Sequence, residues 1–419
     1  MRGPVGIGAK EKKDIIVMKF GGTSISDTDK IKKAADKVIT AKLSGCSVVA
    51  VVSAMGDATD NLINIASSIS KNPSHREMDM LMSTGEQVSM ALLSMAIQEK
   101  GYDCMSLTGK QAGILTDDVY SNAKILSVDK ERLLKELGSN KIIVVAGFQG
   151  TTPAGEITTL GRGGSDTTAV ALASVLGAKY CEIYTDVDGV FTADPRVESN
   201  SNKIETMSYD EMLELASSGA KVLHLRAAEF AKKHSIVLHV RSSFNDIKGT
   251  WIMDIKDSDK KMEKPLISGV THDTNQVKIS IFGLYDKPGI AAKLFGGMAD
   301  KNVNVDLIVQ NVSENNLATI SFTIKNEDLN AARKVLEDIK DKLGIGKIGI
   351  DTEVAKVSIV GAGMQTHPGV AAKMFDLLGQ QDINIEMIST SPIRISCVIR
   401  KEKTRKAVRV LHKGFILDK

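Results

Sequence analysis

The sequence predicts an α/β protein with an open, mainly parallel sheet between layers of helices, followed by two smaller ferredoxin-like βαββαβ modules. Three observations predict this fold. Strands and helices alternate along the chain up to residue 252. Several of these strands are unbroken Val/Ile runs, which suit a parallel sheet covered on both faces. Beyond residue 265, one stretch repeats without gaps at a spacing of 80 residues.

The first elements set the pattern of the large sheet. Asp14–Lys19 is a β-branched strand, and Ile31–Leu43 has helical periodicity after a turn rich in Gly, Ser and Asp. Ser47–Ser53 is a continuous apolar strand, so the chain begins with a strand, a helix and a second strand. Later helices are expected at Asn61–Ser70, Glu77–Lys100, Thr167–Leu176 and Tyr209–Leu223, and later strands at Lys141–Ala146, Cys181–Tyr184 and Val237–Arg241.

The C-terminal repeat predicts a pair of related modules. Asp286–Ile308 aligns with Thr366–Ile388, and eight of the 23 positions are identical. Each copy follows a strand, Val277–Phe282 or Lys356–Val360, opens a helix at a Pro-Gly pair and continues into strands. Two copies are too few for a solenoid, so the order of elements indicates two βαββαβ units.

Length and composition agree with several folded domains. At about 150 residues per domain, 419 residues make two or three. A polar, charge-dense stretch after Trp251 marks the main boundary. We therefore expect a disordered leader at 1–13, a large α/β domain at 14–252, a linker at 253–265, and modules at 266–345 and 346–419.

Composition also excludes several classes of protein. Hydrophobic residues make up 42% of the chain and charged residues 25%, which is ordinary globular usage. The net charge of +3 and the 4% of aromatic residues predict no nucleic-acid or membrane partner. Without a hydrophobic leader or membrane span, a cytoplasmic location is expected. The cysteines are expected to be buried reduced thiols: Cys46, Cys104, Cys181 and Cys397.

The first chemical motif is KFGGTS, Lys19–Ser24, at the junction of the first strand and helix. Glycines allow a close approach of an anion, a helix N-terminus offers N–H groups, and Lys19 adds a positive charge. A phosphate would suit this arrangement, although a tight turn with Lys19 in solvent is an equal alternative. KFGGTS matches neither GxGxxG nor the Walker pattern.

The second motif is Thr158–Ala173, in which Arg162 and Asp166 flank two glycines at the start of a helix. Arginine is suited to bidentate binding of a carboxylate or a phosphate. The alternative is that Asp166 or Thr167 only caps the helix.

Two further stretches carry charged groups. Thr185–Arg196 is an Asp-rich loop after a buried strand, and its carboxylates could bind Mg²⁺ or ribose hydroxyls. A solvated Asx-turn loop is the alternative. Ser217–Arg226 places Lys221 near a helix end, where most lysines only solubilise. Together the four motifs favour phosphoryl transfer, because cations and glycine-rich turns follow parallel strands and no acyl-transfer constellation is visible among the seven histidines.

In these motifs the sequence resembles the aspartate kinases of the amino-acid kinase family. The resemblance extends to tandem ACT regulatory modules at the C-terminus. It implies an amino-acid kinase fold and ATP-dependent phosphorylation of the side-chain carboxylate of L-aspartate to 4-phospho-L-aspartate, with ATP and Mg²⁺ as cofactors. This is the first step towards lysine, threonine and methionine. The stretches that match in order and approximate spacing are 19–24, 53–60, 83–86, 159–169, 185–196 and 219–223.

The resemblance also implies roles for individual residues. The catalytic residues would be Lys19, Arg162, Asp166 and Lys221, with Asp166 orienting Lys19. Aspartate would be held by Thr59, Glu86, Arg162 and Ser165, with Glu86 on its ammonium and Arg162 on its α-carboxylate. The nucleotide would contact Lys19, Phe20, Gly21, Gly22, Thr185, Asp186, Phe191, Asp194, Arg196, Lys221 and Val222. Phe191 stands where many relatives have Tyr, and no metal ligands are assigned.

The ACT modules imply feedback inhibition by lysine, threonine or both. Free N–H groups after the two Pro-Gly pairs could bind an effector carboxylate. Pro392 replaces a Glu of some relatives, which leaves the effector open. Effector contacts are expected from Asp286, Ala291, Asn304, Val305, Asp306 and Gln310 in the first copy, and from Val370, Ala371, Asn384, Ile385 and Ser391 in the second.

The resemblance further implies a homo-oligomer formed through the ACT modules. A separate regulatory subunit could start at Met262, although an ordinary methionine is equally plausible. Two other functions stay open: another amino-acid kinase, acting on acetylglutamate or glutamate, or a non-catalytic amino-acid sensor. Intact Lys19 and Asp166 argue against the sensor.

Overall fold

The computed structural model describes residues 13–220, 222–255, 266–312, 317–415 and 417. Two compact units divide the chain, and each combines several segments. The first unit comprises Met1–Val190, Lys203–Leu213 and Lys221–Asp257. The second comprises Phe191–Asn202, Glu214–Ala220 and Ser258–Lys419. Lys221, Met262, residues 1–12 of the expected leader and residues 256–265 of the expected linker lie outside the described residues.

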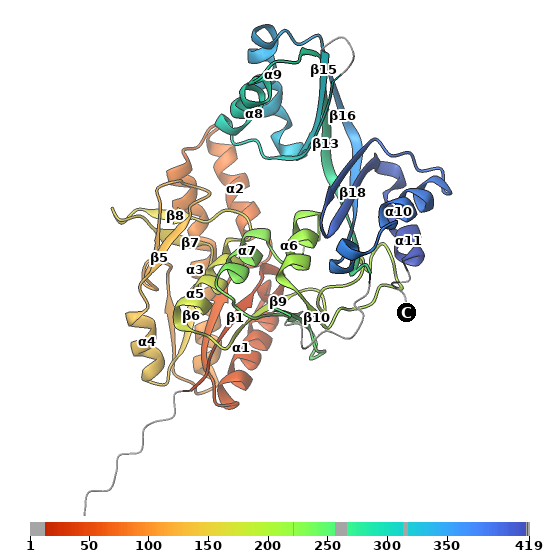
Figure 1. The fold of residues 1–419 in the computed structure, drawn as a ribbon. Coiled ribbons are helices and arrows are strands. Elements are labelled where there is room, and N and C mark those ends of the chain that lie inside the picture. The colour runs from red at the N-terminus through yellow and green to blue at the C-terminus, as the bar shows by residue number, and fades with distance from the viewer. Residues whose placement is uncertain (1–12, 221, 256–265, 313–316, 416, 418–419) are drawn as a thin grey trace, which may run out of the picture. The chain divides into compact units, whose positions relative to one another are not determined.

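The first unit is built on an eight-stranded sheet (Figure 1). Its central strands are parallel, as the Val/Ile runs predict, and among the strands that the structure describes in this sheet only β11 and β12 pair antiparallel. In sheet order the strands are β10 (Thr206–Met207), β12 (Thr250–Ile252), β11 (Leu238–Ser242), β9 (Tyr180–Thr185), β1 (Ile15–Phe20), β2 (Ser47–Val52), β6 (Ile142–Ala146) and β3 (Cys104–Leu107).

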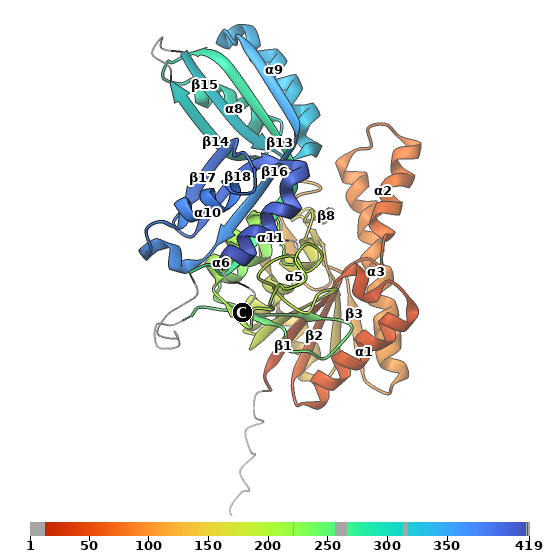
Figure 2. The same cartoon turned by 90° about the vertical axis from the view of Figure 1, so that its right-hand side faces the viewer.

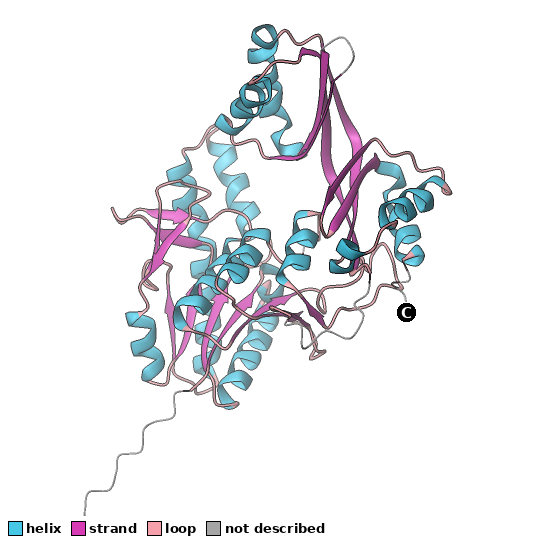
Figure 3. Ribbon diagram, in the orientation of Figure 1, coloured by secondary structure: helices cyan, strands magenta, loops and turns pink. Residues whose placement is uncertain are grey.

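Helices cover both faces of this sheet (Figures 2 and 3). Helix α1 packs beside α3 on one face, and α5 contacts β1, β2 and β9 on the other. The helices of this unit are α1 (Thr28–Leu43), α2 (Ala58–Ile69), α3 (His75–Glu99), α4 (Glu131–Gly138), α5 (Gly164–Leu176) and α7 (Leu225–Lys233).

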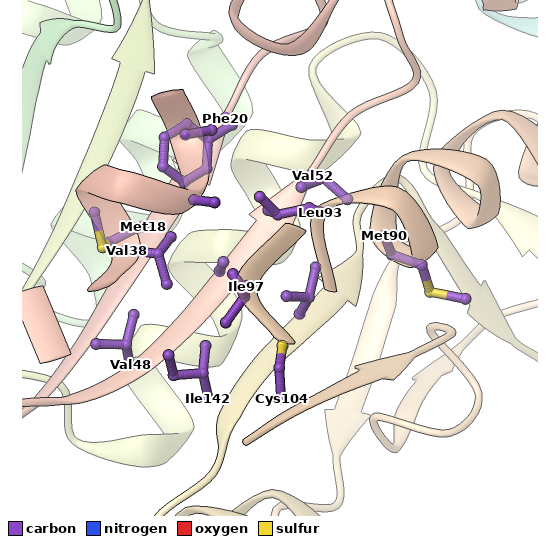
Figure 4. Packing of buried hydrophobic residues seen from close by; sticks show 14 of the residues in the cluster. Met18, Phe20, Val38, Val48, Val52, Met90, Leu93, Ile97, Cys104 and Ile142 are labelled. Atoms are coloured by element: carbon purple, nitrogen blue, oxygen red, sulfur yellow. The ribbon is translucent and has the colours of Figure 1, made fainter. Parts of the chain in front are cut away.

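Side chains from β1, β2 and β6 interlock with those from α1 and α3 in the main core of the first unit (Figure 4). Phe20 is fully buried there and stacks on Tyr184, with ring centroids 4.8 Å apart. Burial of an apolar side chain of this size contributes about 2–3 kcal/mol to folding. The core therefore fixes the ends of the parallel strands.

A second, four-stranded sheet is formed by strands that lie between β3 and β9 along the chain. The sequence did not predict this sheet. Its strands are only three or four residues long, too short for a reliable alternating pattern. In sheet order they are β5 (Ile125–Val128), β4 (Ile114–Thr116), β7 (Gln149–Thr151) and β8 (Ile157–Thr159).

The expected helix at Tyr209–Leu223 is wrong in its second half. Helix α6 covers Tyr209–Ser217 and stops there, and α7 begins at Leu225. Gly219 has a φ of +115°, which no helix contains. The apolar pattern of the sequence continues across this break, so periodicity alone predicted a helix that is too long.

The second unit contains a six-stranded antiparallel sheet in which two ferredoxin-like modules are joined. In sheet order the strands are β14 (Val305–Val312), β15 (Leu317–Ile324), β13 (Gly269–Tyr285), β16 (Lys347–Val360), β18 (Arg394–Arg400) and β17 (Met387–Ser391). The helices are α8 (Ile290–Asp300) and α9 (Leu329–Leu343) in the first module, and α10 (Val370–Gly379) and α11 (Thr404–Gly414) in the second.

Both modules use the long strands β13 and β16 (Figure 1). The later part of β13 pairs with β15 and with Lys347–Asp351 of β16, whereas Gly269–Asp273 pairs with Lys356–Val360. The first module therefore has the expected βαββαβ order. The second copy departs from it: α11 is its last described element, and the place of a final strand beside β16 is taken by Gly269–Asp273 of β13.

Candidate active site

The carboxyl ends of the parallel strands surround a cavity of about 680 Å³ in the first unit. This is the usual position for a ligand in an open α/β sheet. Six of the residues that the sequence predicted for catalysis or substrate binding line it: Lys19, Thr59, Glu86, Arg162, Ser165 and Asp166. Residues that are 147 positions apart in the chain, Lys19 and Asp166, thus share one site.

Lys19 and Asp166 form an ion pair inside this cavity. Lys19 lies near the end of β1 and Asp166 in the first turn of α5. The lysine Nζ is 2.6 Å from Asp166 Oδ1, and the two side chains are 12% and 11% exposed. The carboxylate therefore holds the ammonium in one place, where it can meet an anionic ligand.

Glu86 has the least solvated carboxylate of the lining. It lies on α3 and is only 3% exposed. Its Oε1 accepts a hydrogen bond from Ala54 N at 3.1 Å, whereas its Oε2 is buried with no hydrogen-bond partner among the described residues. Burial raises the pKa of Glu86 to about 8. A cationic group of a ligand would satisfy the open oxygen and favour the ionised form.

Arg162 offers a free cation on the other side of the glycine-rich turn. Its side chain is exposed to the cavity, and within the described part of the chain its guanidinium makes no hydrogen bond or ion pair. Ser165 and Thr59 lie in the first turns of α5 and α2. The site thus combines an unpaired carboxylate oxygen and an unpaired guanidinium, which is what an amino acid with a free α-carboxylate requires.

Sequence reasoning assigned no role to several other lining residues, although Ser53, Ala54 and Asp60 lie in the stretch 53–60 that carries the resemblance. Ser53 and Ala54 follow β2 directly, and Phe148 follows β6. Their position after buried parallel strands was a signal that could have found them. Ser121 and Asp60 also line the cavity, and no local pattern marks Ser121.

Comparison with known proteins shows the family of the chain. Residues 14–242 match the model of the amino acid kinase family, and residues 279–339 and 357–415 match an ACT domain. The chain is 50% identical to aspartokinase 2 of Bacillus subtilis over 406 residues, covering 97% of this chain and 98% of the relative. It is 47% identical to an aspartate kinase of Stutzerimonas stutzeri over 404 residues, covering 96% and 98%.

The chain belongs to the aspartokinases of the amino acid kinase family. A crystal structure of E. coli aspartokinase III with aspartate and ADP, in the R-state, superposes with a TM-score of 0.83 at 26% identity, covering 96% of this chain and all of the other. The same E. coli enzyme with lysine and aspartate, in the T-state, gives a TM-score of 0.74. As an aspartokinase the chain is a phosphotransferase, and its ACT domains indicate allosteric regulation.

In the first unit of this aspartokinase, three expected nucleotide contacts lie at strand ends. The side chain of Phe20 belongs to the core, so only its main chain is available to a ligand. Gly22 lines the cavity two residues after the end of β1. Thr185 ends β9, and its hydroxyl donates to Asp186 Oδ1 at 3.1 Å.

The other expected nucleotide contacts are divided by the unit boundary. Phe191, Asp194 and Arg196 belong to the second unit, whereas Val222 belongs to the first. Asp194 accepts hydrogen bonds from the main chain and the guanidinium of Arg196, and these bonds lower its pKa. Lys221 lies outside the described residues.

The donor set of the aspartokinase site suits a magnesium ion carried by a nucleotide. No group of three or more His, Cys, Asp or Glu side chains in the described ranges is placed to hold a metal ion. Mg²⁺ in kinases is usually held by phosphate oxygens with one or two carboxylates, not by a protein cage. Asp166 and the exposed Asp60 are carboxylates of the cavity that can supply such a contact.

The described part of the chain also contains no helix long and apolar enough to cross a membrane.

The second unit has its own cavity, of about 340 Å³, in the first ACT module. It lies where β13 passes through Pro288-Gly289 into α8. Three expected effector residues line it: Asp286, Ala291 and Gln310.

The remaining expected effector residues lie elsewhere in the second unit. Asn304 is exposed, and Val305 packs against the core of the first module. Asp306 forms an ion pair with Lys356. In the second copy, Val370, Ala371 and Ile385 pack in or against the core, Asn384 is exposed, and Ser391 donates to Glu214 Oε1 at 2.7 Å.

Proposed function

We propose that the cavity of the first unit binds L-aspartate and ATP and transfers the γ-phosphoryl group to the side-chain carboxylate, giving 4-phospho-L-aspartate. The observation that carries this proposal is the open, buried oxygen of Glu86, which lies in the same cavity as the unpaired guanidinium of Arg162. An amino acid with a free ammonium and a free α-carboxylate satisfies both groups at once.

The same observation separates aspartate from one of its rivals. Acetylglutamate carries a neutral amide in place of an ammonium, so it would offer Glu86 a single N–H and no positive charge. The ionised carboxylate would then lack a counter-charge in its buried position, which is strongly unfavourable. Glutamate keeps the ammonium, and only its longer side chain distinguishes it.

The reaction needs little from the protein beyond positioning and charge neutralisation. A free aspartate side chain has a pKa near 4, so the nucleophile is already ionised at neutral pH and no general base is required. Lys19, held by Asp166, would bind the transferred phosphoryl group, and Mg²⁺, when bound with the nucleotide, would neutralise phosphate charge. Arg162 and Glu86 would orient the amino acid for in-line attack.

The cavity beside Gly289 would bind the effector. Its lining combines main-chain N–H groups at the start of α8 with the Asp286 carboxylate and the Gln310 amide, which suit an amino acid's two charged groups. Lysine and threonine are the candidates, and activity measured with each one singly and with both together distinguishes them. An enzyme that is insensitive to all three conditions contradicts this role.

One assay tests the catalytic proposal. The purified chain is incubated with ATP, Mg²⁺, hydroxylamine and one of aspartate, glutamate or acetylglutamate, and the acyl phosphate is trapped as a hydroxamate. Product with aspartate alone is expected. Product only with another acceptor identifies a different amino acid kinase, and no product with any acceptor indicates a sensor.

A further inference from the structure

The loop that carries Arg162 is connected to a second chain segment that lies far from it in sequence. Strand β8 ends at Thr159, and Leu160 leads into the loop. Beside them runs the segment Ser121–Ala123, where Ala123 N donates to Thr159 O at 2.9 Å. A single main-chain hydrogen bond of this kind contributes only about 1 kcal/mol, so other groups must fix the two segments to each other.

Asp79 binds the donor groups of both segments. It lies on α3 and is completely buried. Its carboxylate accepts from Ser121 N at 2.9 Å, from Ser121 Oγ at 3.2 Å, and from the N and Oγ1 of Thr159, both at 2.8 Å. All the hydrogen bonds of this buried group therefore serve to hold the two segments together.

Arg226 binds the acceptor groups of the same two segments. It projects from the first turn of α7, donating from Nη1 to Leu160 O at 2.8 Å and from Nη2 to Ala123 O at 2.7 Å. The planar guanidinium presents two donors in a fixed fork, so it sets the separation of the two carbonyl oxygens. Neither Asp79 nor Arg226 is among the residues that line the cavity.

The loop needs external support because its own backbone is permissive. Gly161 and Gly163, on either side of Arg162, have φ values of +76° and +69°. Glycine reaches this region freely and loses more conformational entropy on ordering than any other residue. Recognition of a carboxylate by a guanidinium is bidentate and tolerates little displacement. The pose of Arg162 therefore depends on how firmly residues 159 and 160 are held.

We propose that Asp79 and Arg226 are positioning residues: by joining residues 121–123 to residues 159–160, they set the pose of Arg162 towards the α-carboxylate of the amino acid substrate. This inference rests on the proposed function, because it assigns Arg162 to substrate binding. It adds two residues to which the sequence had assigned no role, Asp79 and the Arg226 that ends the motif 217–226, and neither lines the cavity.

The test compares steady-state kinetics of Asp79→Asn, Arg226→Met and Thr159→Val with the unaltered enzyme. Each removes some of the hydrogen bonds that join the two segments. The KM for the amino acid is expected to rise about tenfold or more, the equivalent of ~1.4 kcal/mol. The KM for ATP and kcat at saturating amino acid should stay within about threefold, because ground-state binding is what is lost. Arg226→Lys, which keeps the charge without the fork, should recover only part of the affinity.

Glu182→Gln is the matched control. Glu182 is also a buried carboxylate of the first unit, and it accepts hydrogen bonds from Tyr184 and Arg241 on the strands β9 and β11. Among the described residues, Glu182 makes no hydrogen bond to either segment. This variant should lower the melting temperature while leaving the KM for the amino acid unchanged, which separates a positioning role from a general loss of stability.

Hydrogen exchange supplies a readout that does not depend on turnover. Without substrate, amides of residues 159–166 should exchange faster in Asp79→Asn and Arg226→Met than in the unaltered enzyme, and should be unaffected in Glu182→Gln. Thr159→Val removes one hydroxyl donor to Asp79 and leaves a side chain of nearly the same shape. This variant can therefore test the proposal even if Asp79→Asn does not fold.

The outcomes separate this inference from the proposed function. The KM is measured for whichever amino acid the unaltered enzyme phosphorylates, so a different substrate leaves the test intact. An unchanged KM in folded Arg226→Met and Thr159→Val overturns the inference. So does an equal rise in Glu182→Gln, or unchanged exchange of residues 159–166.

Discussion

At the scale of single residues, Glu86 has the environment with the clearest chemical consequence. Its pKa of about 8, raised by burial, means that it is mostly protonated at neutral pH in the absence of ligand. A protonated carboxyl group cannot pair fully with an ammonium, so binding of the substrate requires ionisation of Glu86. Below the pKa of Glu86, this ionisation costs free energy, and substrate binding is weaker by that amount.

We therefore predict that the KM for the amino acid falls as pH rises from about 6.5 to about 9, because the ionised fraction of Glu86 increases through its pKa of about 8. In Glu86→Gln, the KM should be higher by about tenfold or more and should lose this pH dependence. Initial rates at saturating ATP across this range provide the measurement. A flat KM profile in the unaltered enzyme would contradict the role.

Lys19 is the cation best placed to meet a phosphoryl group, because its 2.6 Å ion pair with Asp166 fixes its position in the cavity. Lys19→Ala should lower kcat by about 10²–10³-fold with the fold retained. The control is Lys37→Ala, which removes a lysine of α1 that pairs with Asp246 at 3.0 Å. Circular dichroism checks folding in both variants. Near-normal turnover in Lys19→Ala would exclude a catalytic role.

At the scale of elements, the two Pro-Gly pairs predicted helix starts that the structure confirms. Gly289 and Gly369 precede α8 and α10 with φ values of +91° and +93°, and no atom would obstruct an added Cβ at either position. The repeat therefore conserves a backbone conformation, which only glycine adopts without strain.

Gly289, which precedes α8, and Gly296, which lies within it, give opposite predictions for the same substitution. Gly289→Ala should destabilise the protein by about 1 kcal/mol, because alanine is strained at positive φ. Gly296→Ala, inside the same helix with open space around it, should stabilise it by about 0.5–1 kcal/mol. Chemical denaturation measures both free energies of unfolding. Two changes of the same sign would show that the conformation of Gly289 is not what limits substitution there.

The sequence predicted strands β1, β2, β6, β9 and β11 of the large sheet to within a residue, because unbroken apolar runs are local signals. It missed β3, β10 and β12, which are only two to four residues long. It could not predict that β13 has two partners in two modules, since strand pairing is set by contacts distant in sequence. The same limit applies to the site. Lys19, Glu86 and Arg162 were found from motifs, whereas Asp79 and Arg226 act through backbone groups that only the folded chain brings together.

At the scale of the whole molecule, the two ACT modules form one structural unit because they share strands. Each half of β13 contributes to a different core: Ile279 and Ile281 to that of the first module, and Val270 to that of the second. A smaller cluster, which includes Leu307 of β14 and Val354 of β16, packs between the strands of the two modules. We therefore expect the modules to unfold together.

An ion pair between Lys356 and Asp306 also joins the two modules. Lys356 lies on β16 within the second module, its side chain is completely buried, and burial lowers its pKa. Its Nζ donates to Asp306 of β14, in the first module, and to Ser217 O at 3.3 Å. Ser217 ends α6, four residues before Lys221, so this one ammonium links both modules to a segment next to an expected catalytic residue.

We predict that Lys356→Met lowers the free energy of unfolding by about 1–3 kcal/mol, because the charge-assisted hydrogen bond to Asp306 and the hydrogen bond to Ser217 O are both lost. Asp306→Asn should cost a similar amount, since the buried ammonium is left without its counter-ion. The double variant should lose clearly less than the sum of the two, because both losses arise from breaking one pair. Denaturation of the four proteins at the same pH measures this coupling. Strict additivity would mean that the pair does not join the modules energetically, and that each side chain is stabilised by its own surroundings.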